Sequence, residues 1–282
     1  MTNEPFGYCM NTSTLRNFGL DLAEEARICA EVGFRAIEPW VRQLEAHKDK
    51  GGSLDDLRKL LEDLGLEVAG AIAFFKWADA DPQVRADALE DARRQMELVA
   101  AVGGRSIAAP PFGQVAETSL DAMAESFRKL DAVGKQVGVK PILEFWGMAP
   151  RLRTLAETLY VAAATRLPDV QILLDVYHLY KGGSGHSTIG LVKGNAIGIV
   201  HINDYPANPP RERIQDSDRV FPGDGIAPMG QFLRDLADAG YRGMLSLELF
   251  NADYGERSPA EVAREGLEKT RAAVQAALEG SA

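Results

Sequence analysis

The chain alternates short apolar runs with longer segments whose apolar residues recur at helical spacing. The short runs are rich in Val, Ile, Leu and Ala and lack the strict alternation of a half-exposed sheet. Such runs are typical of parallel strands buried on both faces. The expected strands cover residues 6–9, 34–38, 66–73, 105–109, 140–144, 171–175, 197–201 and 244–248.

The longer segments carry the signals that begin and end helices. Residues 53–64 begin with SLDD, a Ser N-cap followed by acidic residues in the first turn, and stop at Gly65. Residues 20–32 stop at Gly33, a residue type that favours the left-handed conformation closing many helices. Further helices are expected over residues 82–102, 119–137, 152–165, 228–239 and 258–278, with a shorter one near 188–193.

Three helices lead into the next strand through nearly the same phrase. AEVGFRAIE, EDLGLEVAG and ADAGYRGMLSLE each pass from a helix through Gly to a strand, which is the short connection of a repeating β/α architecture. Eight such units in 282 residues give about 35 residues each, an ordinary size. We therefore predict the α/β class and a single (β/α)8 TIM barrel domain over residues 1–282. A doubly wound open sheet is the alternative, disfavoured because no GxGxxG opens the first helix.

Composition and charge narrow the class of partner. The chain carries 31 Lys and Arg against 41 Asp and Glu, and its net charge of −10 disfavours a nucleic-acid partner. No apolar run approaches the roughly 20 residues of a membrane span, and residues 1–5 lack the features of a signal peptide. Cys9 and Cys29 lie among apolar neighbours, as expected of buried free thiols. We expect a cytoplasmic protein with no membrane partner.

Ionisable residues end four consecutive predicted strands. Glu144 ends PILE, Asp175 ends QILLD, His201 ends IGIVH and Glu248 ends MLSLE. The carboxyl ends of barrel strands face the active site, so we expect these side chains to converge. Each alone would usually be a cap or a salt-bridge partner, but together they cannot be buried without compensation. One divalent metal ion supplies it, with Mn²⁺ or Mg²⁺ favoured by the oxygen-rich set and Zn²⁺ or Co²⁺ as alternatives.

The same segments carry a resemblance to a known family. LEFW, LLDVYH, VHINDYP, RVFPGDG and LSLELF resemble segments of the xylose isomerase-like barrels, over essentially the whole chain. That family includes sugar isomerases and epimerases, inosose isomerases and dehydratases, and the endonuclease IV group. The resemblance implies that Glu144, Asp175, His201 and Glu248 bind one divalent metal ion. It also implies that His178 contacts a substrate hydroxyl.

This ligand set suggests a reaction. A ketose or keto-cyclitol would bind the metal through its carbonyl and a neighbouring hydroxyl, and the metal would stabilise a cis-enediolate. Glu144 and Glu248 leave strands five and eight and would approach opposite faces of the sugar as the catalytic acid–base pair. Proton return on the other face would epimerise and transfer along one face would isomerise, and which glutamate acts first is open. Expulsion of a hydroxyl would instead make the site a dehydratase for an inosose or 3-keto-sugar.

Further residues are candidates for the substrate pocket. Trp146, two residues beyond the end of strand five, is expected to form an apolar wall for the sugar ring. Arg211, in the long charged loop 204–224, is expected to contact a substrate hydroxyl or phosphate, with Arg213 or Arg219 as alternatives. The ends of strands two and three add Glu38, Trp40, Phe74, Phe75 and Trp77.

Two other classes of function share this fold. A DNA-repair endonuclease would need histidines from earlier strands for three zinc ions, and none of the four histidines ends strand three or four. A barrel that binds sugar without turning it over would be expected to lack part of the ligand set, which is complete here. The favoured hypothesis is a metal-dependent isomerase or epimerase of a small sugar or cyclitol, and assembly into a homo-oligomer is open.

Overall fold

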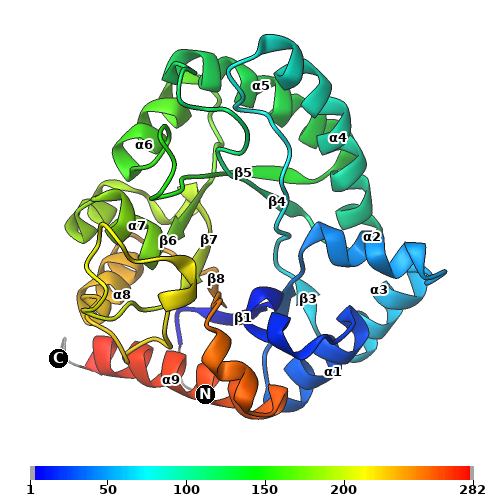
Figure 1. Cartoon of the computed structure of the whole chain (residues 1–282), viewed down its shortest axis with the longest axis vertical. Coiled ribbons are helices and arrows are strands. Elements are labelled where there is room, and N and C mark those ends of the chain that lie inside the picture. The colour runs from blue at the N-terminus through cyan, green and yellow to red at the C-terminus, as the bar shows by residue number, and fades with distance from the viewer. Residues whose placement is uncertain (1–3, 280–282) are drawn as a thin grey trace.

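The strands form one sheet that curls around a central axis, with the helices outside it (Figure 1). The structure is a computed structural model that describes residues 4–279. All strand pairs are parallel, in the order β3-β2-β1-β8-β7-β6-β5-β4. The strands are β1 (Gly7–Asn11), β2 (Ala36–Glu38), β3 (Glu67–Val68), β4 (Ser106–Ala109), β5 (Lys140–Glu144), β6 (Ile172–Asp175), β7 (Ile197–Ile202) and β8 (Met244–Leu247). The predicted (β/α)8 barrel is confirmed.

The predicted helices are confirmed within a few residues at each end. Capping contacts explain where several begin: the Ser53 side chain accepts a hydrogen bond from the backbone N–H of Asp56, and Asp21 does the same for Glu24. The helices are α1 (Leu22–Val32), α2 (Val41–Asp49), α3 (Leu54–Asp63), α4 (Pro82–Ala101), α5 (Leu120–Val137), α6 (Leu155–Ala164), α7 (Val176–Gly182), α8 (Met229–Asp238) and α9 (Pro259–Glu279).

Two short helices, α2 and α7, were not predicted. In α2 only Val41 and Leu44 are buried, so the segment has too few apolar positions to show a helical period. Helix α7 follows β6 without a loop, because Asp175 ends the strand and also caps the helix. The expected short helix near 188–193 is a 3-10 helix over His186–Leu191.

The predicted third strand, residues 66–73, was too long. Only Glu67–Val68 pairs as a strand, and the ring is completed by single hydrogen bonds. The Ala108 N–H donates to the Ala71 carbonyl at 2.9 Å, and Ser106 Oγ donates to the Ala69 carbonyl at 2.9 Å. A Cβ at Gly70 would lie 2.9 Å from Glu38 Oε1, so the chain here makes room for a buried carboxylate and does not continue the ladder.

A small apolar cluster fills the floor of the barrel. It is separate from the larger core between sheet and helices, and each member comes from a strand or its extension: Ile72, Ala108, Ile142, Leu173 and Ile199. Cys9 and Cys29 are buried free thiols, as predicted. The larger of the cavities beside this cluster, at about 1150 Å³ against about 550 Å³, lies at the end of the barrel where the strands finish.

The ends of the chain limit two predictions. The predicted domain over 1–282 and the prediction about residues 1–5 extend into residues 1–3 and 280–282, which lie outside the described residues. Within residues 4–279, no helix combines the length and the apolar character needed to cross a bilayer.

Substitution of Gly194 tests the packing of the segment that leads into β7. A Cβ there would lie 2.3 Å from the backbone of Gly240 and Tyr241, whereas Gly190 has no atom within 4 Å of the same position. We expect Gly194→Ala to lower the free energy of unfolding by about 1–3 kcal/mol, because backbone must shift. Gly190→Ala, the matched control, should leave it nearly unchanged. Equal denaturant midpoints for the two variants would contradict this packing.

Candidate metal centre

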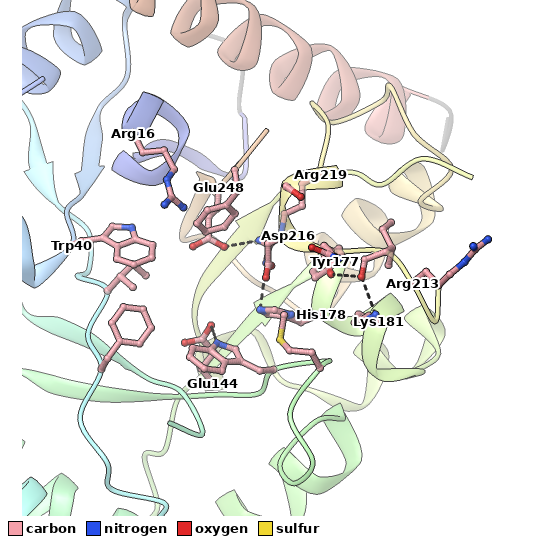
Figure 2. A pocket seen from close by; sticks show the side chains of 18 of the residues that line it. Arg16, Trp40, Glu144, Tyr177, His178, Lys181, Arg213, Asp216, Arg219 and Glu248 are labelled. Carbon is pink, nitrogen blue, oxygen red and sulfur yellow. Dashed lines mark hydrogen bonds and ion pairs between the residues drawn. The ribbon is translucent and has the colours of Figure 1, made fainter. Parts of the chain in front are cut away.

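A cavity of about 1150 Å³ opens at the carboxyl ends of the strands. Figure 2 shows side chains from opposite sides of the barrel pointing into it, with Trp40 facing the group around Glu248, Arg219 and His178. Asp175 and His201 lie one layer deeper, in contact with Arg219 and Glu248. The lining includes Arg16, Trp40, Phe74, Glu144, Trp146, His178, Lys181, Arg219, Glu248 and Phe250.

Three of the four predicted ligands meet at the base of this cavity. Asp175 ends β6, His201 lies in β7 and Glu248 directly follows β8, and one ligand atom of each lies within 4.8 Å of the others. His201 Nδ1 is 3.1 Å from Glu248 Oε2 and 3.6 Å from Asp175 Oδ2. All three side chains are buried. They meet because the register of neighbouring parallel strands brings the strand ends to one level.

The ring nitrogens of His201 fit a metal ligand. Nδ1 is buried without a hydrogen-bond partner, and Nε2 lies 3.1 Å from Glu38 Oε2. Burial alone would lower the pKa of His201, but the carboxylates of Glu248 and Glu38 raise it well above its ordinary value. An imidazole nitrogen facing two carboxylate oxygens is a donor set that suits a divalent cation.

The two carboxylate oxygens of Asp175 have different roles: one stabilises the fold, and the other faces the candidate metal site. Oδ1 accepts the backbone N–H of His178 at 2.9 Å, which caps α7, and also the side-chain amide of Asn203 at 3.3 Å. Oδ2 faces His201 and Arg219. Although burial disfavours the charged form, the Arg219 guanidinium holds the pKa of Asp175 well below its ordinary value.

Glu144 lines the same cavity but lies outside this three-residue group. Its Oε1 accepts a hydrogen bond from Trp146 Nε1 at 3.0 Å, so the predicted ligand and the predicted ring wall contact each other. Trp146 packs on Phe74, which packs on Trp40. These rings form an aromatic side of the cavity across from Arg219 (Figure 2).

Of the three candidate arginines in the loop after β7, Arg219 and Arg213 line the cavity and Arg211 does not. Arg219 is fully buried and its Nη1 donates to Asp175 Oδ2 at 3.0 Å and to Glu248 Oε2 at 2.7 Å. Its guanidinium carbon lies 4.4 Å from the ring centre of Tyr177. Arg211 is half-exposed beside Glu212. Arg213 lines the cavity, but its side chain extends away from Glu144 and Glu248 (Figure 2).

The loop after β7 is held by Asp204, which explains how Arg219 reaches the site. The buried Asp204 carboxylate accepts the backbone N–H groups of Tyr205 at 2.7 Å, Ala227 at 2.9 Å and Gly223 at 3.0 Å. The loop is thus fastened at both ends by one side chain. That role is structural, since Asp204 is not part of the ligand group.

His178 lines the cavity, and hydrogen-bond donors face both of its ring nitrogens. The backbone N–H of Gly147 donates to Nδ1 at 3.3 Å, and Arg219 Nη2 lies 3.4 Å from Nε2. Burial lowers the pKa of His178, which favours the neutral ring. Of the aromatic candidates, Trp40 and Phe74 line the cavity, whereas Phe75 and Trp77 belong to the core.

Sequence reasoning missed Asn11, which joins two parts of the site. Its Nδ2 lies 3.1 Å from Glu38 Oε2 and 3.2 Å from Glu248 Oε1. The first strand was predicted to end at residue 9, but β1 runs to Asn11. The signal was available, because Asn11 is a polar residue at the end of an apolar run, like the four predicted ligands.

Comparisons with known proteins agree with this architecture. An inosose isomerase of Bacillus licheniformis is 25% identical, covering 93% of this chain and 95% of that protein. A 3-dehydroshikimate dehydratase of Pseudomonas aeruginosa is 27% identical over 90% of this chain and 41% of that protein. The crystal structure of the IOLI protein with a bound zinc atom shares the fold, with a TM-score of 0.88 at 23% identity, covering 95% and 98% of the two chains.

The two relatives carry names of both reaction types expected from the sequence, isomerase and dehydratase. The model of the xylose isomerase-like TIM barrel family matches residues 26–273. That match takes in every strand from β2 to β8 and all the predicted ligands. The chain therefore belongs to the xylose isomerase-like TIM barrel family.

Proposed function

We propose that this protein is a metal-dependent isomerase or epimerase of a small keto-sugar or keto-cyclitol. The observation that carries the proposal is the group of Asp175, His201 and Glu248 at the base of an open cavity, with His201 Nδ1 facing an oxygen of each carboxylate. The family membership and the named inosose isomerase relative support the same reaction class.

Asp175, His201 and Glu248 would hold the metal ion, with Glu144 as the fourth ligand. The carboxylate-rich set favours Mn²⁺ or Mg²⁺, and Zn²⁺ or Co²⁺ are the alternatives. The ion would supply Lewis acidity, which polarises a substrate carbonyl and acidifies the neighbouring C–H bond. The remaining chemistry belongs to side chains of the protein.

The two glutamates are placed to move a proton. Glu144 lies on the aromatic side of the cavity and Glu248 on the Arg219 side (Figure 2), so a substrate between them would present one face to each. Burial, together with the charges of Glu248 and Asp175, raises the pKa of Glu144 to about 8. That pKa belongs to the metal-free site, and in the reaction each glutamate would accept or return the proton on the substrate face beside it.

Other cavity residues would bind and orient the substrate. His178, beside Arg219, would form a hydrogen bond with a substrate hydroxyl. Arg219, held by Asp175 and Glu248, takes the role first predicted for Arg211 and would stabilise negative charge on a substrate oxygen. Trp146 would cover the apolar face of the ring.

A dehydratase is the second candidate, supported by the similarity to the 3-dehydroshikimate dehydratase over 90% of this chain. Both reactions begin with removal of a proton next to a carbonyl by a positioned base. They differ in whether that proton returns or a hydroxyl leaves from the adjacent carbon. A cytoplasmic location and assembly into a homo-oligomer stay predictions from the sequence.

Hydrogen exchange tests the reaction class. The metal-loaded protein, incubated with keto-inositols and ketohexoses in D₂O, is expected to place deuterium on a carbon next to the carbonyl. Proton NMR reads the label and separates an isomerised product from an alkene formed by loss of water. Chelator treatment should abolish exchange and Mn²⁺ should restore it. A protein that binds no metal and exchanges no proton would contradict the proposal.

Removing a glutamate tests the acid–base pair. We expect Glu248→Gln to reduce kcat by about 10²–10⁴-fold while far-ultraviolet circular dichroism stays unchanged, because a positioned proton acceptor is lost. Glu212→Gln is the matched control, since Glu212 is an exposed carboxylate at the rim of the same cavity. Near wild-type turnover in Glu248→Gln would exclude this residue from the reaction.

The raised pKa of Glu144 predicts a pH-dependent stability in the metal-free protein. The folded state holds this proton up to about pH 8, whereas the ordinary pKa is 4.5. Between these values the folded state binds more protons, so its stability falls as pH rises. Glu144→Gln permanently mimics the protonated form. Its free energy of unfolding should therefore rise relative to that of wild type between about pH 5 and about pH 9. A constant difference in unfolding free energy across this range would refute the assignment.

A further inference from the structure

Glu38 is a buried carboxylate on which three hydrogen-bond donors converge. It ends β2 and is 1% exposed. Ser246 Oγ lies 2.7 Å from its Oε2, Asn11 Nδ2 3.1 Å and His201 Nε2 3.1 Å. Within residues 4–279, no Lys or Arg forms an ion pair with it, and the one ionisable hydrogen-bond donor it contacts is His201.

The contact with His201 decides which ring nitrogen carries the proton. A carboxylate only accepts hydrogen bonds, so Nε2 must carry the hydrogen that points at Glu38. In the neutral ring that a metal ion requires, the lone pair is then on Nδ1, which lies 3.6 Å from Asp175 Oδ2 and 3.1 Å from Glu248 Oε2.

We propose that Glu38 is a positioning residue that fixes the tautomer and orientation of His201 and thereby makes Nδ1 the metal ligand. The inference rests on the metal site of the proposed function. Histidine ligands commonly donate their second N–H to a carboxylate, which strengthens them as donors. Glu38 touches neither the substrate cavity lining nor the three ligand atoms, so its action runs through His201.

The surroundings of Glu38 are built for that charge. A side chain at Gly70 would place its Cβ 2.9 Å from Glu38 Oε1. The absence of a side chain at this position therefore leaves room for the Glu38 carboxylate. Asn11 donates to Glu38 and to Glu248 with the same amide nitrogen. The Glu38 carboxylate is thus linked by hydrogen bonds to His201 and, through Asn11, to Glu248. Packing of the fold alone would not require these links.

Zinc affinity of matched variants tests the inference. Glu38→Gln keeps the shape and one acceptor oxygen but removes the charge. Glu25→Gln is the control, because Glu25 is equally buried at 1% exposure and pairs with Gln43 away from the ligands. In chelator competition with Zn²⁺ we expect Glu38→Gln to bind about 10–100-fold more weakly than wild type, and Glu25→Gln to match wild type.

The position of the His201 ring proton is a second measurement, and it would not change if Glu38 had only a structural role. In the Zn²⁺-loaded wild type, the long-range ¹H–¹⁵N spectrum should show the His201 proton on Nε2, assigned by its loss in His201→Gln. With four histidines in the chain, the spectrum is simple. We expect this proton to resonate at higher field in Glu38→Gln, because its acceptor is neutral there, and to stay in place in Glu25→Gln.

Three results would overturn the inference, and they are distinguishable. If wild type binds Zn²⁺ and Glu38→Gln binds it equally well, Glu38 does not support the ligand, while the metal site stands. The same holds if the proton lies on Nδ1 in the loaded protein. If wild type binds no Zn²⁺, the metal site and this inference fail together. Circular dichroism of each variant confirms that the comparison concerns folded protein.

Discussion

The rest of the site depends on the burial of several carboxylates in one small volume. Glu38, Glu144, Asp175 and Glu248 are each 5% exposed or less. Such a concentration of negative charge away from water would cost many kcal/mol without compensation. Arg219, His201 and hydrogen-bond donors supply that compensation, and the architecture around them is arranged to bring them in. The strand ends set the positions of the carboxylates, and the long loop after β7 delivers the guanidinium.

Several side chains serve the fold and the site at once. One oxygen of Asp175 caps α7 while the other faces the candidate ligand group. Asp204 fastens the loop that carries Arg219. Lys181 of α7 donates to three carbonyl groups of that loop. Because these contacts link α7 to the loop, His178 and Arg219 are positioned by a common framework.

The sequence predicted the barrel and the ligand-bearing strand ends because both follow from local pattern. Apolar runs that finish in Glu144, Asp175, His201 and Glu248 place those residues at one level in any β/α barrel. Asn11 was missed because the first strand was predicted to end at residue 9, although its apolar run continues through Met10 to Asn11. Arg219 could not be told from Arg211, because the path of a long loop depends on long-range contacts such as those of Asp204. Helix α7 was hidden because its cap is itself the last residue of a strand.

The incomplete pairing between β3 and β4 makes the barrel a split ring. An unbroken series of backbone ladders runs from β4 through β8 to β2 and includes every strand that carries a predicted ligand, whereas the split is bridged by isolated hydrogen bonds. A split ring opens at its cut and keeps its curvature elsewhere. Deformation caused by a bulky substrate would therefore be absorbed beside Phe74, and the spacing of the ligands on the opposite arc would be preserved. The aromatic side of the cavity is then the side on which substrate size can change with the least effect on the spacing of Asp175, His201 and Glu248.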